Sequence, residues 1–113
     1  MTKIKIYKKK DILTGFECKG HTGYADFGKD IVCASVSSLV QSCILGLQKV
    51  VGLDIKYKID EEKGYIKFEL PEGLDKDNLH DSQVLLLTLK DSLENLQSGY
   101  SQYISMEVIE NVY

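Results

Sequence analysis

Residues 20–37 read GHTGYADFGKDIVCASVS and combine residue types that can carry out nucleophilic catalysis. His21 stands in a glycine-rich stretch, and Cys33 follows at the start of an apolar run with helical spacing. The thiolate is the nucleophilic form of cysteine, and a nearby histidine can take the thiol proton and later protonate a leaving amine. The pair therefore indicates covalent catalysis, although by residue type alone a cysteine is more often a small core residue.

The apolar spacing from residue 31 to about 50 predicts a helix, and Asp30 stands where its N-cap would be. Cys33 then lies near the third helical position, where unpaired N–H groups and the helix dipole stabilise a thiolate. The same N–H groups, or those of the preceding loop, could hold an oxyanion. Asp30 could also orient His21, as the third member of a catalytic triad does. Ser37 is four residues after Cys33 and could hydrogen-bond near the site or only to the helix backbone.

The segment before this helix contains three glycines and no hydrophobic period, so it is predicted to be a loop. Gly20, Gly23 and Gly28 would let its backbone approach a substrate closely. Tyr24 and Phe27 have two equally acceptable roles, because they could line a pocket for an apolar substrate residue or cover the local core.

Three cysteines form an odd set without a close-paired motif. Cys18 and Cys43 are expected to be core residues. Cys18, His21 and Cys33 could in principle bind zinc, but a structural zinc site needs a fourth ligand and the spacing lacks a second pair. We therefore predict no metal and no cofactor. Free thiols and the absence of an apolar leader predict a cytoplasmic protein.

Length and composition limit the classes of protein and of partner that fit this chain. With 113 residues the chain fits one domain, 1–113, because domains commonly hold about 100–150 residues. Five lysines fall between Lys3 and Lys10, but there is no arginine to make bidentate contacts, so nucleic-acid recognition is not expected. The most apolar run, Val32–Val51, is interrupted by serine, glutamine and lysine, so no membrane partner is predicted.

Hydrophobic periodicity predicts the order ββαββαβ. Strands are expected at 3–8, 12–18, 55–59, 66–70 and 104–108, and helices at 31–50 and from about 77 to 97. In the second strand, Ile12, Thr14, Phe16 and Cys18 should share one face. The order predicts an α+β fold in which two long helices pack on a five-stranded, largely antiparallel or mixed sheet. It does not decide whether both helices lie on the same face.

From Gly20 to Ser37 the chain reads Gly-His-x-Gly-Tyr-Ala-x-x-Gly-x-Asp-Ile-Val-Cys-Ala-x-Val-Ser, which resembles the signature of the ribosomal-processing cysteine proteases. The resemblance extends over the whole chain in length and element order. It implies a catalytic dyad of His21 and Cys33. It also implies a substrate, the N-terminal extension of large-subunit ribosomal protein twenty-seven, cut after an aromatic residue.

Two other functions fit the same residues. The loop could hold a protein tail in a non-enzymatic ribosome-associated binding or assembly factor, or the cysteine could be a redox sensor. A homodimer is also predicted, because the first helix carries few charges and a small domain has little with which to cover it. The resemblance favours the same oligomeric state.

Overall fold

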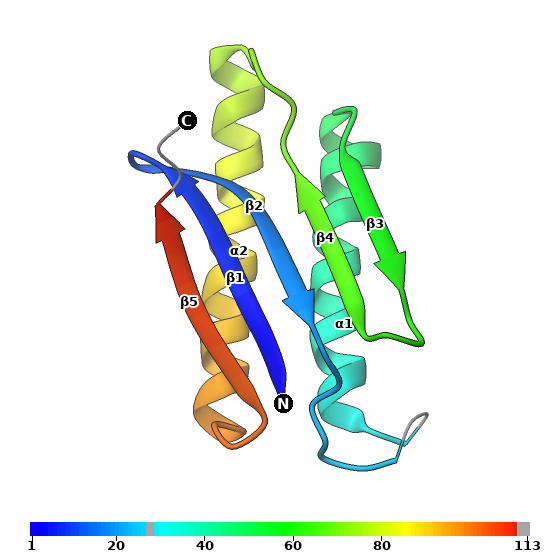
Figure 1. Cartoon of the computed structure of the whole chain (residues 1–113). Coiled ribbons are helices and arrows are strands. Elements are labelled where there is room, and N and C mark those ends of the chain that lie inside the picture. The colour runs from blue at the N-terminus through cyan, green and yellow to red at the C-terminus, as the bar shows by residue number, and fades with distance from the viewer. Residues whose placement is uncertain (27–28, 111–113) are drawn as a thin grey trace.

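The computed structural model describes residues 1–26 and 29–110 and confirms the order ββαββαβ (Figure 1). Its elements are β1 (Thr2–Lys9), β2 (Ile12–Lys19), α1 (Ile31–Leu45), the π-helical segment η1 (Gly46–Val51), β3 (Lys56–Asp60), β4 (Tyr65–Glu69), α2 (Lys76–Gly99) and β5 (Ile104–Glu110). The fold is α+β, as predicted.

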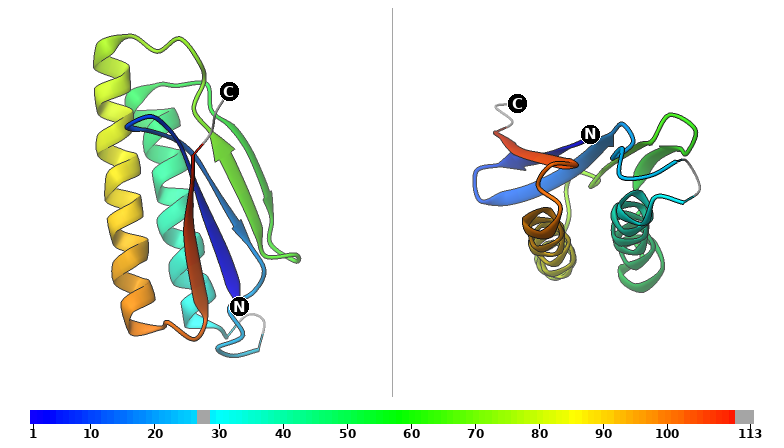
Figure 2. Two further views of the ribbon diagram at one scale, coloured as in Figure 1. Left: turned by 60° about the vertical axis from the view of Figure 1, so that its left-hand side comes forward. Right: turned by 90° about the horizontal axis from the view of Figure 1, so that it is seen from below.

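The five strands form one mixed sheet in the order β3-β4-β2-β1-β5. The β1–β5 pair is parallel and the other three pairs are antiparallel. Both helices pack on the same face of this sheet (Figure 2), with α1 against β4 and α2 against β2 and β5. The molecule therefore has two layers, and β3 and β5 are the sheet edges.

The hydrophobic core lies between the helices and the sheet. At its centre the Phe16 and Phe68 rings stack with their centroids 5.6 Å apart. Apolar side chains recur every second residue along the strands and every three or four residues along the helices, as these periods require. Those with almost no exposed surface include Ile4, Ile6, Phe16, Val32, Val40, Leu47, Phe68, Leu86, Leu93 and Ile104.

The face assignment in β2 is correct only in its second half. Phe16 and Cys18 are buried, but Ile12 and Thr14 are half-buried and Leu13 is buried instead. The register with β1 shifts at this point, which leaves Thr14 as the extra residue of a β-bulge. One extra residue moves every side chain before it to the other face of the sheet.

The first helix begins at Ile31 as predicted, but it does not remain an α-helix to its end. Its last six residues, Gly46–Val51, are π-helical, and Gly52 follows with φ +86°. The Leu47 carbonyl accepts hydrogen bonds from the amides of both Gly52 and Leu53, which widens the last turn. Hydrophobic spacing alone does not distinguish such a turn from an α-helical one.

Within the described residues, Ile31–Val51 is the one helical stretch that is long and apolar enough to cross a membrane. Of the 18 residues within it that meet this criterion, 33% are buried within the protein. The core helix of a soluble protein meets the same criteria of length and composition, so the finding is weak evidence for a membrane span. It does show that apolar side chains on this helix remain exposed, among them Leu45 and Val50.

Candidate active site

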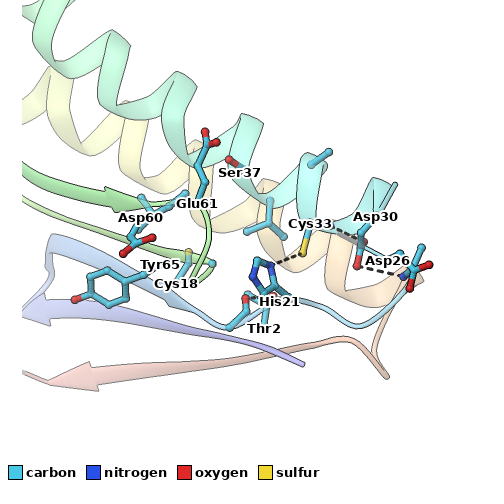
Figure 3. Close-up of a pocket in the computed structure, with 16 residues that line it drawn as sticks. Thr2, Cys18, His21, Asp26, Asp30, Cys33, Ser37, Asp60, Glu61 and Tyr65 are labelled. Carbon is cyan, nitrogen blue, oxygen red and sulfur yellow. Dashed lines mark hydrogen bonds between the residues drawn. The ribbon is translucent and has the colours of Figure 1, made fainter. Parts of the chain in front are cut away.

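The structure brings His21 and Cys33 together at one end of the sheet (Figure 3). His21 lies just beyond β2, and Cys33 lies in the first turn of α1. The Cys33 Sγ atom is 4.0 Å from His21 Nδ1. It also accepts a hydrogen bond from the backbone N–H of Thr22, at 3.1 Å. The sulfur atom therefore has a hydrogen-bond donor on one side and an imidazole on the other, the surroundings in which reactive cysteines are found.

Asp30 is the N-cap of α1, as predicted. Its Oδ1 atom accepts hydrogen bonds from the amides of Val32 and Cys33, at 3.0 and 2.9 Å. These are two of the amides that the sequence offered as oxyanion donors, and the cap engages both of them. The cap therefore takes up two of the amides that could otherwise have bound an oxyanion.

The second oxygen of Asp30 organises that loop. Its Oδ2 atom accepts from the Thr22 hydroxyl at 2.5 Å and from the amides of Tyr24 and Ala25 at 3.0 and 3.3 Å. Burial of this carboxylate raises its pKa, but the hydrogen bonds from Thr22, Cys33, Ala25 and Tyr24 outweigh burial and lower the pKa from 3.8 to about 2. One charged side chain thus joins the histidine loop to the start of the cysteine helix.

The imidazole of His21 is held from its far side by the β3–β4 turn. Its Nε2 atom lies 2.8 Å from the backbone carbonyl oxygen of Glu62. Because a carbonyl oxygen can only accept, Nε2 carries a hydrogen and donates it. The hydrogen bonds that Asp30 accepts come from the loop and from the start of the helix, and its suggested role in orienting His21 stays a prediction.

A cavity of about 490 Å³ opens beside the two reactive groups. Its lining includes His21, Cys33, Ser37, Asp60, Glu61 and Tyr65. Figure 3 shows Asp60 and Glu61 on the side of His21 away from Cys33. Among the residues that the structure describes, the lining also includes Asp26 and Asp30 and no lysine, so acidic groups dominate its charge.

The loop residues named from the sequence have different surroundings. Gly20 lines the cavity with φ +92°, and a Cβ there would lie 2.9 Å from the Met1 carbonyl oxygen. Gly23 also has a positive φ, +78°, but is not part of the lining. Gly28 and Phe27 lie outside the described residues.

Tyr24 packs away from the cavity. Its ring meets those of Tyr100 and Tyr103 edge to face, with centroids 5.7 and 5.4 Å apart. Ser37 does line the cavity, and its hydroxyl oxygen accepts a hydrogen bond from Gln41 Nε2 at 2.7 Å. Tyr24 therefore anchors the loop to the segment between α2 and β5, whereas Ser37 faces the reactive side of α1.

The other two cysteines are buried, as predicted. Burial raises the pKa of Cys18 to about 12, with a further contribution from the charge of Glu17, and burial raises the pKa of Cys43 to about 12. Cys33 is half-buried, and all three thiols are free. No group of three or more histidine, cysteine or acidic side chains in residues 1–26 and 29–110 is arranged to hold a metal ion.

Several groups at the site were not identified from the sequence. They are the amide of Thr22, the carbonyl of Glu62, and Asp60, Glu61 and Gly64. The last four lie at the end of β3 and in the β3–β4 turn, whose composition indicates only a hairpin. No signal in the sequence connects this turn to His21. The two are distant along the chain, and the turn contacts His21 through a backbone carbonyl, which almost any residue type would supply.

Comparison with known proteins gives a consistent result. Residues 1–105 match the family described as cysteine protease Prp. The ribosomal processing cysteine protease Prp of Bacillus subtilis (strain 168) is 33% identical over 103 residues, which cover 91% of this chain and 89% of that protein. The crystal structure of SMU.848 from Streptococcus mutans superposes with a TM-score of 0.84 at 26% identity, covering 98% and 96% of the two chains.

The fold is also that of the ribosomal processing protease Prp from S. aureus, solved in complex with a covalently linked product peptide. That structure has a TM-score of 0.85 at 19% identity and covers 96% of this chain and 100% of its own.

Proposed function

This chain belongs to the cysteine protease Prp family and is a cysteine protease, and we propose that Cys33 is its nucleophile and His21 its general base and acid. The observation that carries the assignment is the 4.0 Å approach of Sγ to Nδ1 at the wall of the cavity. The N–H of Thr22, 3.1 Å from the sulfur, adds a donor that stabilises the thiolate. Cys18 and Cys43 are poor alternatives, because burial keeps them protonated.

In the proposed reaction the Cys33 thiolate attacks the carbonyl carbon of the scissile bond, and the carbonyl oxygen takes the negative charge. His21, which holds the thiol proton, protonates the amine as the C–N bond breaks and leaves a thioester on Cys33. His21 then accepts a proton from water, the resulting hydroxide attacks the thioester, and the product leaves as a carboxylic acid that releases its proton to the solvent. The thiolate and the imidazolium are restored.

The proposed substrate is the N-terminal extension of large-subunit ribosomal protein twenty-seven, cut after an aromatic residue. The name of the B. subtilis relative and the substrate peptide bound to the S. aureus protease support a ribosomal precursor. The cavity beside Cys33 has room for substrate side chains. Such a substrate is made at the ribosome, so we also propose that the protein acts in the cytoplasm.

Cleavage of the purified extended precursor tests this assignment. Cys33→Ala and Cys33→Ser should abolish cleavage, and His21→Ala should slow it by about 100-fold or more, the usual contribution of a general base. His80→Ala is the matched control, because His80 is the other histidine and its side chain is 76% exposed on α2. A Cys33→Ala protein that cleaves normally refutes the nucleophile. Retention of uncut precursor by the wild type would instead favour the non-enzymatic binding factor.

We further propose a homodimer that forms through the side of the molecule made by α1, η1 and β3. Val50 is 84% exposed, and Leu45 and Tyr57 are also exposed. Tyr57 pairs with Phe68 and therefore faces the helices, yet it stays exposed because β3 is an edge strand. An apolar helix face beside an open sheet edge favours a second copy of the chain.

Light scattering should show about twice the chain mass of 12.7 kDa at micromolar concentration. Val50→Lys should shift the protein towards the monomer. Leu87→Lys, at a 50% exposed position on α2, should leave the dimer intact. A wild-type monomer over this range of concentrations would contradict the proposal.

A further inference from the structure

The β3–β4 turn, residues 61–64, contacts the histidine loop at two points. The Glu62 carbonyl oxygen lies 2.8 Å from His21 Nε2, and the Gly64 carbonyl oxygen accepts a hydrogen bond of 3.0 Å from the Gly20 amide. The turn is itself closed by a bond of 3.1 Å from the Gly64 amide to the Glu61 carbonyl. The turn therefore hydrogen-bonds both to His21 and to Gly20, the residue before it.

We propose that this turn is the positioning element of the histidine, the role that a third side chain plays in a catalytic triad. This inference rests on the proposed Cys33–His21 dyad. By accepting a hydrogen bond from Nε2, the Glu62 carbonyl fixes the Nε2–H tautomer of the neutral ring, so that the lone pair of Nδ1 is directed at the sulfur. When Nδ1 gains the thiol proton, the same carbonyl stabilises the imidazolium.

Gly64 is the residue that permits this contact. Its φ is +61°, and a Cβ would lie 2.9 Å from the Gly20 carbonyl carbon and 3.1 Å from His21 Nδ1. A side chain at this position would therefore push on the imidazole and on the backbone that carries it. Gly73 is a matched control, because its φ of +72° is similarly unfavourable for a side chain but a Cβ there would meet nothing within 4 Å.

The first test compares Gly64→Ala with Gly73→Ala. Both should lose some thermal stability, since both force alanine into a left-handed conformation. Only Gly64→Ala should lower kcat, by about 100-fold, as expected for a small displacement of a catalytic group. Its KM should stay within about twofold, because the turn acts on His21, and a kcat near that of Gly73→Ala would overturn the proposal.

The pH dependence of iodoacetamide alkylation of Cys33 gives a readout that loss of stability does not produce. Four acidic groups line the same cavity as His21, namely Asp60 at the end of β3, Glu61 in the turn, and Asp26 and Asp30 before α1. Gly64→Ala keeps all of them, so a shift of half-maximal alkylation towards alkaline pH reports the displaced imidazole. An unchanged midpoint in a folded Gly64→Ala protein counts against the proposal.

Nitrogen NMR of the unmutated turn covers the case in which Gly64→Ala does not fold. In ¹⁵N-histidine-labelled Cys33→Ala protein, His80→Ala assigns the two histidine signals. Neutral His21 should be the Nε2–H tautomer, and a dominant Nδ1–H tautomer would overturn the proposal. The dyad is tested separately. If His21→Ala cleaves the precursor normally, the proposed function fails. If His21→Ala is slow but Gly64→Ala cleaves normally, the dyad stands and the turn is not the positioning element.

Discussion

Asp30→Asn separates the two roles of the carboxylate that joins the histidine loop to α1. Asparagine can still cap the helix, because one oxygen suffices for the amides of Val32 and Cys33. Its amide nitrogen would then replace Oδ2 and face three donors, from Thr22, Tyr24 and Ala25. We therefore expect an intact helix start and a loop that loses its anchor.

The magnitude follows from the lowered pKa of Asp30. A fall from 3.8 to about 2 means that the folded protein favours the carboxylate by about 2 kcal/mol, since a tenfold change in proton affinity is worth about 1.4 kcal/mol. Because the pKa is depressed in the folded state, this stability is present above about pH 4 and is lost as the pH falls towards 2. Asp30→Asn should lower the free energy of unfolding by about 2 kcal/mol at pH 7. Asp30→Ala should lower it by about 1 kcal/mol more, because alanine also removes the cap.

Urea unfolding at pH 7 and near pH 2.5 measures these differences, and the gap between wild type and Asp30→Asn should narrow at the lower pH. Asp75→Asn is the matched control, because Asp75 caps α2 at an exposed site and its carboxylate accepts from the Asn78 amide. That change should stay within about 0.5 kcal/mol. If Asp30→Asn matches the wild type at pH 7, or if the gap is the same at both pH values, the carboxylate does not hold the loop as argued.

Two further predictions concern the thiols and Thr22. Iodoacetamide in limiting amount at pH 7 should modify Cys33 first, which peptide mapping would show. With a pKa of about 12, only about one Cys18 or Cys43 thiol in 10⁵ is ionised at this pH. Earlier labelling of either residue would contradict the prediction. Thr22→Val should lower the free energy of unfolding, measured in urea, by about 1–2 kcal/mol. It should also slow Cys33 alkylation, because the hydroxyl that holds the Thr22 amide against the sulfur is lost. Thr88→Val on the exposed face of α2 should do neither, and equal effects of the two would refute a special role for Thr22.

Much of this fold, and the placement of Asp30 and Cys33 in the site, could be predicted from the sequence, because the sequence signals for them are local. Asp30 and Cys33 lie within one helical turn, so a capping residue before an apolar run suffices to locate the cysteine among the first amides of α1. The periods of the strands and helices, with polar or glycine-containing turns between them, similarly predict the element order. The resemblance to a protease family supplied the pairing of Cys33 with His21, which spacing alone does not establish.

Tertiary packing decided the rest. The parallel pairing of β1 with β5, the bulge at Thr14 and the placement of both helices on one face depend on contacts between distant segments. The same is true of the hydrogen bond between His21 and Glu62, which joins residues 41 positions apart through a backbone carbonyl. Any residue except proline offers the same backbone donor and acceptor, so only the folded chain determines which carbonyl meets the imidazole.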